Sequence, residues 1–290
     1  MKNVLITGAN SYIGDNVKAY LDSSLDLYNV TIKDTINWTP DPSDFKDYDV
    51  VFNVAGIAHI KETKENRNLY YDVNRDLAIS IAKAAKEGGV KQFILLSSMS
   101  VYGMTAGCIK KDTKPNPVND YGKSKLQADR AIKKLSDESF RFVCLRPPMV
   151  YGKGCKGNYQ ILRSFALKCP VFPKIENQRS MIYIDNLCEF VKEVIDKERK
   201  GLFFPQNAEY VNTSEMVKLV GLTNGHKVRL MKIFNPFVLF VMKTPIKLFE
   251  NVSKIFGNLT YEMIDAGKND GAISKYTFVD SIALTENQIT

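Results

Sequence analysis

The stretch "TGANSYIG", Thr7–Gly14, decides which fold we expect of this chain. It follows the apolar run "VLI", which predicts a strand, and it leads into "YIGDNVKAYLDSS", where Ile13, Val17 and Leu21 have helical spacing. A glycine turn between a strand and a helix sets the helix N-terminus, with its free N–H groups and positive dipole end, against a phosphate group. The stretch therefore predicts a turn that binds the pyrophosphate of a dinucleotide.

The residues of this turn have different expected tasks. Gly8 and Gly14 allow the tight turn and the close packing of helix on strand, whereas Ser11 stands where such turns usually have a third glycine. The Ser11 side chain costs clearance and supplies a hydroxyl donor, so we expect its N–H or hydroxyl to approach the pyrophosphate. Because a glycine motif alone is a weak indication, a turn that binds no ligand is the alternative. The expected cofactor contacts are Gly8, Asn10, Ser11, Tyr12, Ile13 and Gly14.

The second strand, "YNVTIKD", ends at Asp34, some twenty residues past Gly14. An acid at this place accepts hydrogen bonds from a ribose, which favours NAD as cofactor. Its neighbour Lys33 could accept a 2′-phosphate, so NADP is not excluded, and ordinary solvation of a strand end is the alternative for both. The chain is short between Asp34 and "DVVFNVAG", which leaves little room for a third strand and its adenine contact.

The first half of the chain alternates strands and helices. After "YDVVFNVAG" (Tyr48–Gly56) come the helix "LAISIAKAAKEGGV" and the strand "KQFILLSS" (Lys91–Ser98), and the helix "YGKSKLQADRAIKKL" and the strand "RFVCLRPP" continue the pattern. Buried β-rich runs separated by helices predict a parallel sheet that is covered on both faces. We expect the α/β class, with a doubly wound Rossmann core over residues 1–150.

The pattern loosens after Tyr151. A loop-rich stretch is followed by the amphipathic helix "IDNLCEFVKEVIDKE" and by "GLFFPQN", which reads as a returning strand. We therefore expect residues 181–207 to return to the core, and residues 151–180 and 208–290 to form a smaller, interleaved lobe that binds the substrate.

Composition excludes several classes of protein. With 290 residues, 44% of them hydrophobic and 25% charged, the chain can bury a substantial core. The net charge of +8 comes from lysines spread along the chain without a nucleic-acid signature, so we expect no nucleic-acid partner. Five scattered cysteines form no metal-ligand spacing, and we expect no metal. Without a signal-peptide core or an apolar stretch of about 18 residues, we expect a cytoplasmic protein.

The stretch "NDYGKSKLQ" places Tyr121 and Lys125 four residues apart, on one face of a helix. A close ammonium, with a cationic nicotinamide beyond it, stabilises phenolate and lowers a phenol pKa that is ordinarily about 10. The strand "FILLSS" ends at Ser97 and Ser98, and the carboxyl ends of strands bind ligands in doubly wound sheets. Tyr121 could then exchange a proton with a sugar hydroxyl that Ser98 shares. Alone, the Y-x-x-x-K spacing is common by chance.

Seven motifs stand in an order that makes chance improbable: "TGANSYIG", "NVAGIAH", "DVNRD", "LLSSMSVYG", "YGKSK", "LRPPMVYG" and "QRSMIYIDNL". They resemble the motifs of the extended short-chain dehydrogenase/reductases and, within that group, the NAD-dependent epimerase/dehydratase family, which acts on nucleotide sugars. The resemblance covers roughly residues 1–210, and the closing "YTFVDSIALTEN" resembles the family's C-terminal helix. It implies a UDP-linked sugar as substrate, NAD as cofactor and a homodimer.

The resemblance also implies a role for individual residues. Tyr121 matches the family's general base, Lys125 its tyrosine and ribose partner, and Ser98 its hydroxyl residue. Asn74 is similar to the asparagine that braces the active-site helix near the lysine. The other residues implied to line the cofactor are Ala55, Gly56 and Pro148.

For the sugar nucleotide, Asn158 and Arg179 are similar to residues that hold the diphosphate. The planar guanidinium of Arg179 suits such a group. The alternative for Arg179 is a surface ion pair.

One departure from the family narrows the expected chemistry. Dehydratases of the family have an Asp–Glu pair after the catalytic hydroxyl residue, because elimination of water needs its own acid and base. Here Met99 and Ser100 stand there, which disfavours a 4,6-dehydratase. Epimerisation at C4 through a 4-keto sugar is expected, with reduction of a 4-keto sugar as the alternative. A non-catalytic nucleotide sensor or scaffold is the alternative of another class.

Two further features of the sequence are weaker indications of function. His59 follows a strand end, where a structural role is favoured over a substrate contact. The segment 234–249, "FNPFVLFVMKTPIKLF", is expected to cover the substrate lobe rather than to touch a membrane; an interfacial contact is the less favoured alternative.

Overall fold

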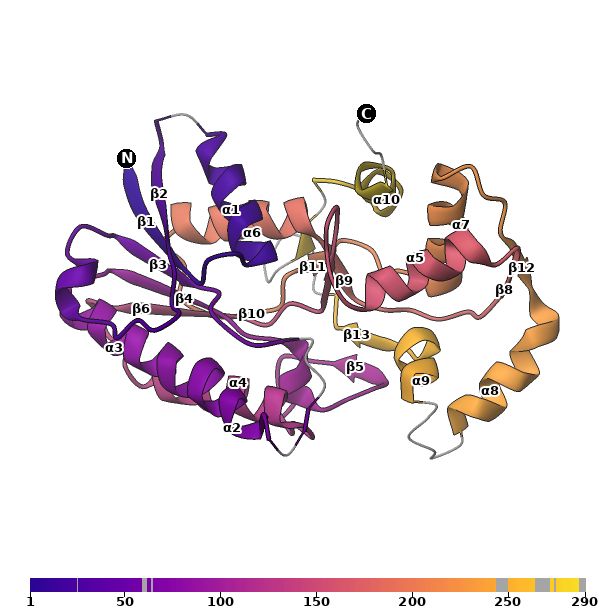
Figure 1. Ribbon diagram of the computed structural model, residues 1–290, viewed down its shortest axis with the longest axis horizontal. Coiled ribbons are helices and arrows are strands. Elements are labelled where there is room, and N and C mark those ends of the chain that lie inside the picture. Colours follow the sequence, from indigo (N-terminus) through magenta and orange to yellow (C-terminus); the bar gives the residue numbers. More distant parts are fainter. Residues whose placement is uncertain are drawn as a thin grey trace. The chain divides into compact units, whose positions relative to one another are not determined.

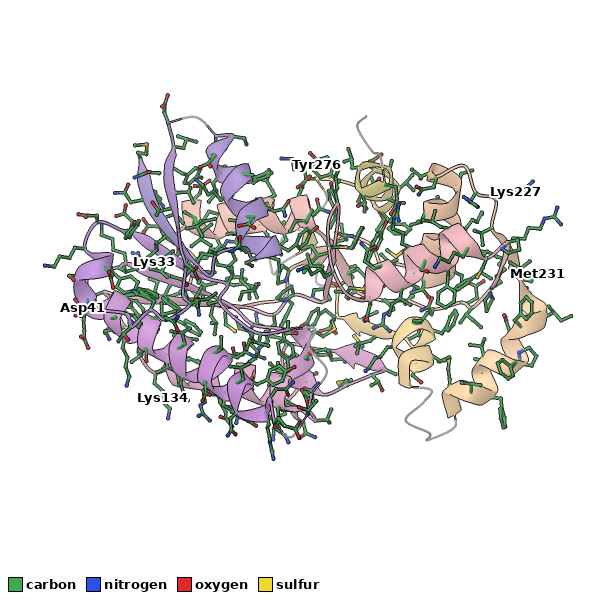
Figure 2. All side chains as sticks on the ribbon, in the orientation of Figure 1. Lys33, Asp41, Lys134, Lys227, Met231 and Tyr276 are labelled. Carbon is green, nitrogen blue, oxygen red and sulfur yellow. The ribbon has the colours of Figure 1, made fainter. Side chains whose placement is uncertain are left out.

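The computed structural model describes residues 1–24, 26–58, 62–63, 65–243, 250–263, 272–273 and 275–286 (Figure 1). The chain divides into two compact units, and side chains fill the space between the elements of each (Figure 2). The first unit comprises Met1–Gly103, Lys114–Pro147 and Leu187–Pro205, and the second comprises Met104–Thr113, Pro148–Asn186 and Gln206–Thr290.

The first unit is built on a six-stranded parallel sheet, which confirms the expected α/β class and the doubly wound Rossmann core. Its strands have the order β10-β6-β4-β3-β1-β2. From β1 the chain passes to β2 on one side and then to β3 on the other, so the crossover point where such sheets bind ligands lies beside β1. The bounds are β1 Lys2–Thr7, β2 Tyr28–Lys33, β3 Val50–Asn53, β4 Gln92–Leu96, β6 Arg141–Leu145 and β10 Gly201–Phe203.

Helices cover both faces of this sheet, with α3 and α4 along one face and α1 and α6 along the other (Figure 1). Under α3 and α4, alternate strand residues such as Leu5, Val51 and Phe93 meet helix residues such as Ile81 and Ile132, all buried. The helical bounds are α1 Tyr12–Asp22, α2 Arg67–Tyr71, α3 Ala78–Glu87, α4 Asp120–Lys133 and α6 Ile184–Asp196; a π-helical turn spans Asp72–Leu77, and 3-10 turns span Pro42–Phe45 and Met99–Tyr102.

Strand β2 is an edge strand. It pairs with β1 from Lys2↔Tyr28 to Thr7↔Lys33, and no strand lies beyond it among the described residues. The chain returns from β2 to β3 through the 3-10 turn Pro42–Phe45. This agrees with the expectation that the short connection after Asp34 leaves no room for a third strand.

The second unit contains short parallel strand pairs with helices around them. The pairs are β7–β9, β12–β8, β13–β5 and β11–β14. The strands are β5 Gly107–Ile109, β7 Met149–Tyr151, β8 Val171–Pro173, β9 Met181–Tyr183, β11 Gln206–Asn207, β12 Arg229–Met231, β13 Leu259–Tyr261 and β14 Ala272–Ile273. The helices are α5 Asn158–Lys168, α7 Thr213–Thr223, α8 Asn235–Lys243, α9 Glu250–Phe256 and α10 Phe278–Glu286, with a 3-10 turn over Lys232–Phe234 before α8.

The bounds of the two units differ from those expected at residues 104–113, 148–150, 181–186 and 206–207, which sequence reasoning placed in the core. Residues 104–113 are attached to the second unit by β5, which pairs with β13 from Gly107↔Leu259 onward. The partner strand lies far along the chain, so no local pattern indicates the pairing.

The described residues also bear on metals and membranes. None of the five cysteines forms a disulfide, and Cys144, Cys155 and Cys188 are buried. In the described part of the chain, no group of His, Cys, Asp and Glu side chains could hold a metal ion. No helix within it is long and apolar enough to cross a bilayer.

Candidate active site

The turn after β1 brings two backbones into close approach at Gly8. Gly8 has φ +113°, and a Cβ there would lie 2.7 Å from the backbone nitrogen of Ala55 and 2.8 Å from its Cα. The Ala55 N–H donates to the Thr7 carbonyl at 2.8 Å, which fixes this approach. Since side chains rarely adopt this φ and a Cβ would strike backbone, only glycine fits here.

Helix α1 starts close against the sheet. A Cβ at Gly14 would lie 3.0 Å from Val54 Cγ2 and 3.2 Å from Ile6 Cγ2, so the absence of a side chain lets the helix pack tightly. The first N–H groups of an α-helix have no acceptor within it and carry the positive end of its dipole. The turn and the start of α1 therefore fit the pyrophosphate of a dinucleotide.

Ser11 is the N-cap of α1. Its Oγ accepts a hydrogen bond from the Gly14 N–H at 3.3 Å. The hydroxyl thus satisfies one of the free N–H groups of the helix and keeps its own proton for donation. Contact between Ser11 and a bound cofactor stays a prediction.

We predict that Ser11→Gly preserves or tightens NAD binding. Glycine is a tolerated N-cap, so the loss of helix stability is only a few tenths of a kcal/mol, and the missing side chain gives the phosphates clearance. Calorimetric titration with NAD measures this. The matched variant Ser11→Ala keeps the Cβ and loses the cap, and we expect about 1 kcal/mol less stability without the gain in clearance. A tenfold or larger loss of affinity in Ser11→Gly would show that the hydroxyl is a required ligand.

At the end of β2, Asp34 is exposed and its Oδ1 accepts a hydrogen bond from the Ile36 N–H at 3.0 Å. This contact orients the carboxylate and leaves its second oxygen for a ribose hydroxyl. The Lys33 ammonium lies over the ring of Trp38, 5.1 Å from its centroid. Because of this cation–π contact, the Lys33 ammonium is less available to bind the 2′-phosphate of NADP.

The two serines at the end of β4 differ in environment. Ser97 is buried, and its hydroxyl donates to Asp129 Oδ2 at 3.1 Å. Ser98 is partly exposed, and its Oγ accepts a hydrogen bond from the Ser100 N–H at 3.1 Å. Ser98 is therefore the serine that can meet a ligand.

Tyr121, in the first turn of α4, lies within reach of Ser98. A Cβ at Gly122 would lie 2.6 Å from the Ser100 carbonyl oxygen, so glycine at this position lets α4 approach the end of β4. Burial raises the pKa of Tyr121, and a hydrogen bond from the Ser98 hydroxyl acts against that shift. In the protein alone the phenol pKa is thus raised. The lowering expected from the Lys125 ammonium together with a bound, cationic nicotinamide stays a prediction.

Lys125, one turn after Tyr121, is almost fully buried. Its ammonium donates to the Leu96 carbonyl at 2.9 Å. Burial lowers the pKa of Lys125 to about 8, and the negative charge of Asp129 acts in the opposite direction. A Cβ at Gly56 would lie 2.9 Å from both Lys125 Nζ and Asn74 Oδ1. Glycine there leaves room for both polar groups at the carboxyl edge of the sheet.

Asn74 joins the end of β3 to α4. In the π-helical turn before α3, its Oδ1 accepts a hydrogen bond from the Ile57 N–H at 2.7 Å. Its Nδ2 donates to the Ile57 carbonyl at 3.1 Å and to Ser124 Oγ at 3.3 Å. Because Ser124 directly precedes Lys125, Asn74 braces the helix that carries the tyrosine and the lysine.

Sequence reasoning missed a carboxylate at the start of α4. The two oxygens of Glu62 accept hydrogen bonds from the Tyr121 N–H at 3.1 Å and the Asp120 N–H at 3.4 Å. Asn119, the N-cap, accepts from the Gly122 N–H at 2.9 Å. The two side chains fix the first turn of α4, and with it the backbone of Tyr121. No local pattern marks Glu62, which lies 58 positions before Asp120.

A buried ion pair beneath Lys125 was also missed. Arg146 and Asp129 are 7% and 4% exposed, and Arg146 Nε and Nη2 each lie 3.0 Å from Asp129 Oδ2. Arg146 Nη1 donates to the Tyr102 hydroxyl at 2.8 Å. The signal that could have indicated the ion pair is Arg146 itself, which directly follows the apolar run "FVCL", because a buried arginine needs a charged partner.

The second unit holds the remaining expected residues. Burial lowers the pKa of Arg179 to about 10; its Nη1 donates to the Gly257 carbonyl at 2.9 Å, and no carboxylate among the described residues pairs with it. The diphosphate contact expected of Arg179 stays a prediction. Asn158 is exposed at the first position of α5, and Pro148 is the first residue of the segment Pro148–Asn186 of this unit.

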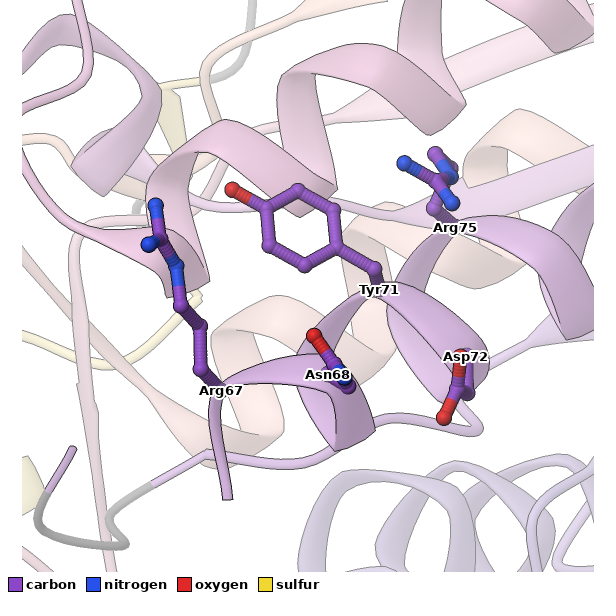
Figure 3. A pocket seen from close by; sticks show the side chains of 5 residues that line it. All are labelled: Arg67, Asn68, Tyr71, Asp72 and Arg75. Atoms are coloured by element: carbon purple, nitrogen blue, oxygen red, sulfur yellow. The ribbon is translucent and has the colours of Figure 1, made fainter. Parts of the chain in front are cut away.

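A surface pocket of about 360 Å³ lies along α2, lined by Arg67, Asn68, Tyr71, Asp72 and Arg75 (Figure 3). Its cations are already paired, Arg67 with Asp120 at 2.9 Å and Arg75 with Asp76 at 2.7 Å. The Tyr71 hydroxyl also donates to Asp120. The pocket therefore offers little to an anionic ligand. His59 lies outside the described residues.

Comparisons of this chain with known proteins agree on one protein family. Residues 4–203 match the NAD dependent epimerase/dehydratase family. The UDP-glucose 4-epimerase of Vibrio cholerae is 31% identical over 243 residues, 75% of this chain and 74% of that protein. The N-acetyl-alpha-D-glucosaminyl-diphospho-ditrans,octacis-undecaprenol 4-epimerase of Escherichia coli O157:H7 is 27% identical over 208 residues, 66% of this chain and 62% of that protein.

Solved structures share the fold at lower identity. The UDP-glucuronic acid 4-epimerase of Bacillus cereus, in complex with NAD, superposes on this chain with a TM-score of 0.74 at 18% sequence identity. The match covers 98% of this chain and 97% of that chain. The dTDP-4-dehydrorhamnose reductase of Bacillus anthracis, in complex with NADP, has a TM-score of 0.74 and 17% identity and covers 98% of both chains.

Proposed function

The chain belongs to the NAD-dependent epimerase/dehydratase family, and from this premise we propose that it is a 4-epimerase of a UDP-sugar that acts through a 4-keto intermediate. The observation that carries the proposal is the close approach of α4 to the end of β4. A Cβ at Gly122 would lie 2.6 Å from the Ser100 carbonyl oxygen, and Lys125 donates to the Leu96 carbonyl at 2.9 Å, so Ser98, Tyr121 and Lys125 gather at one edge of the sheet. These are the groups needed to move a proton on and off a sugar hydroxyl.

The proton steps belong to this chain's own residues. Tyr121 Oη takes the proton of the C4 hydroxyl as the sugar is oxidised and returns it after the keto sugar has turned over. Ser98 Oγ hydrogen-bonds the same sugar oxygen and holds it against the phenol. The buried Lys125 ammonium favours phenolate and reaches toward the cofactor ribose, with Asn74 and Gly56 fixing its place.

NAD, when bound, supplies the hydride acceptor that takes hydride from C4 and can give it back. Gly8 and the start of α1 would hold its pyrophosphate, and Asp34 would hold a ribose. We favour NAD over NADP because Lys33 is engaged over Trp38.

Three observations bear on whether the reaction is epimerisation, dehydration or reduction. The relative with the larger matched share is a UDP-glucose 4-epimerase by name, which supports epimerisation. Met99 and Ser100 follow Ser98 where elimination would need an acid and a base, which argues against a dehydratase. Reduction of a 4-keto sugar uses the same residues once and is the second candidate, supported by the fold likeness to a reductase.

For the substrate, we assign Arg179 and Asn158 to the diphosphate. A partly buried guanidinium without a described carboxylate partner suits a bidentate anion. A sugar on a lipid diphosphate is a second candidate substrate, because one relative acts on such a compound by its name. We also propose a homodimer in the cytoplasm, which gel filtration and cell fractionation would test.

Incubation of the purified protein with UDP-sugars and their 4-keto forms, with and without added NADPH, tests the reaction. We expect interconversion of two UDP-sugars that differ at C4, with no net consumption of cofactor. Stoichiometric oxidation of NADPH would instead assign the reductase. Absence of any turnover, with NAD still bound, would support a sensor or scaffold.

A further inference from the structure

Helix α8 and the turn before it expose large apolar side chains. Ile233, Phe237 and Phe240 are 75%, 71% and 70% exposed. Leu239 and Phe234 are 47% and 38% exposed, and we name these five residues the apolar ridge. Single exposed apolar residues are common, but five within eight positions form a patch of the kind that marks an interaction surface.

The ridge is the outer side of a helix that is seated on the second unit. Val238 and Val241 are 7% and 4% exposed, and Asn235 Nδ2 donates to the Lys174 carbonyl at 2.7 Å. Phe237 and Phe240 are three positions apart on α8 and are therefore neighbours on its surface. Helix α8 thus covers the second unit with only part of its apolar surface, whereas residues 244–249 of the segment lie outside the described residues.

The residues that lead into the ridge and form it carry only positive charge. From Lys227 to Met242 the sequence has three basic residues, Lys227, Arg229 and Lys232, and no acid. Lys227, Arg229 and Lys232 are exposed. Figure 2 shows Lys227 extending away from the ribbon, and Met231 where the chain approaches α8.

We propose that the apolar ridge is a docking surface for an anionic lipid bilayer. Phenylalanine, leucine and isoleucine enter the acyl boundary of such a surface while lysines and arginines beside them meet anionic headgroups. A second copy of this chain suits the surface less well, because a two-fold contact through the ridge would bring its cations face to face. The proposal goes beyond the 4-epimerase reaction and does not depend on it.

Docking would fit a substrate carried on a lipid diphosphate, since the sugar would then be presented at the headgroup level. It would serve equally to hold an enzyme of soluble UDP-sugars near membrane-bound consumers of its product. Vesicle binding alone does not tell these two cases apart. Turnover of a soluble UDP-sugar is therefore measured separately.

The test is sedimentation of the full chain with vesicles of phosphatidylcholine, with and without phosphatidylglycerol. We expect binding to the phosphatidylglycerol vesicles that weakens as salt is added. The double variant Ile233→Ser/Phe237→Ser should bind at least about tenfold more weakly, while NAD binding and turnover of a soluble UDP-sugar stay at the wild-type level. The matched control Leu222→Ser/Val279→Ser removes side chains that are 67% and 59% exposed on α7 and α10, and it should bind vesicles like the wild type.

Charge is tested by Lys227→Gln/Lys232→Gln, for which we expect weaker binding and a smaller salt dependence. Three results would overturn the proposal: no sedimentation with anionic vesicles at low salt, equal binding by the ridge variant and the wild type, or a wild-type dimer in ultracentrifugation that the ridge variant alone converts to monomer. The last result would assign the ridge to a second copy of the chain.

Discussion

Tyr121→Phe is expected to lower kcat by about 10³-fold, because the variant loses the group that moves the proton of the sugar hydroxyl. NAD affinity should be nearly unchanged. The phenyl ring keeps the packing of Tyr121, whose ring meets that of Tyr70 edge to face with centroids 6.4 Å apart. Steady-state turnover of a UDP-sugar and a parallel NAD titration measure the two effects.

Tyr71→Phe is the matched control, since it removes another phenolic oxygen beside the start of α4. That hydroxyl donates to Asp120 at 2.8 Å and has no part in the proposed proton steps. The loss of one such hydrogen bond should change turnover by no more than about fivefold. If Tyr121→Phe also stays within that range, Tyr121 is not the base.

Arg146→Met is expected to lower the free energy of unfolding by about 3–5 kcal/mol, because Asp129 stays buried without its cation. Burial already raises the pKa of Asp129, and loss of Arg146 should raise it further. A carboxyl whose folded-state pKa is raised contributes stability at low pH that is lost as pH rises through that value. The penalty should therefore be smaller in mildly acidic buffer than at neutral pH. Urea unfolding followed by circular dichroism measures both.

The double variant Arg146→Met/Asp129→Leu serves as control, because it removes both charges and keeps apolar volume. We expect it to recover most of the lost stability. Equal destabilisation of the single and double variants would mean that packing, rather than an unpaired charge, causes the loss.

The parts of the site that could be predicted are those made by neighbours in sequence. Thr7–Gly14 contains both the strand end and the helix start, so the spacing of its glycines carries the geometry, and Tyr121 and Lys125 share a helix face because a helix fixes what lies four residues apart. The parallel sheet with helices on its faces follows from the alternation of strands and helices.

The parts that could not be predicted depend on residues distant in sequence. Glu62 reaches the start of α4 from the loop after β3, and β5 finds its partner in β13 near the other end of the chain. The rise of the Tyr121 pKa in the protein alone was not predicted, for a related reason. It is set by how deeply tertiary packing buries the phenol, which spacing alone does not reveal.

The most direct test of the proposed function follows the hydrogen at C4. The purified protein is incubated with its UDP-sugar carrying deuterium at C4, without added cofactor, and both epimers are analysed by mass spectrometry and NMR. We predict that the product epimer keeps the deuterium at C4, because the hydride taken from the sugar is returned to its other face before leaving the site. Product without the label, or label accumulating in reduced cofactor, would contradict a 4-epimerase that works through transient oxidation at C4.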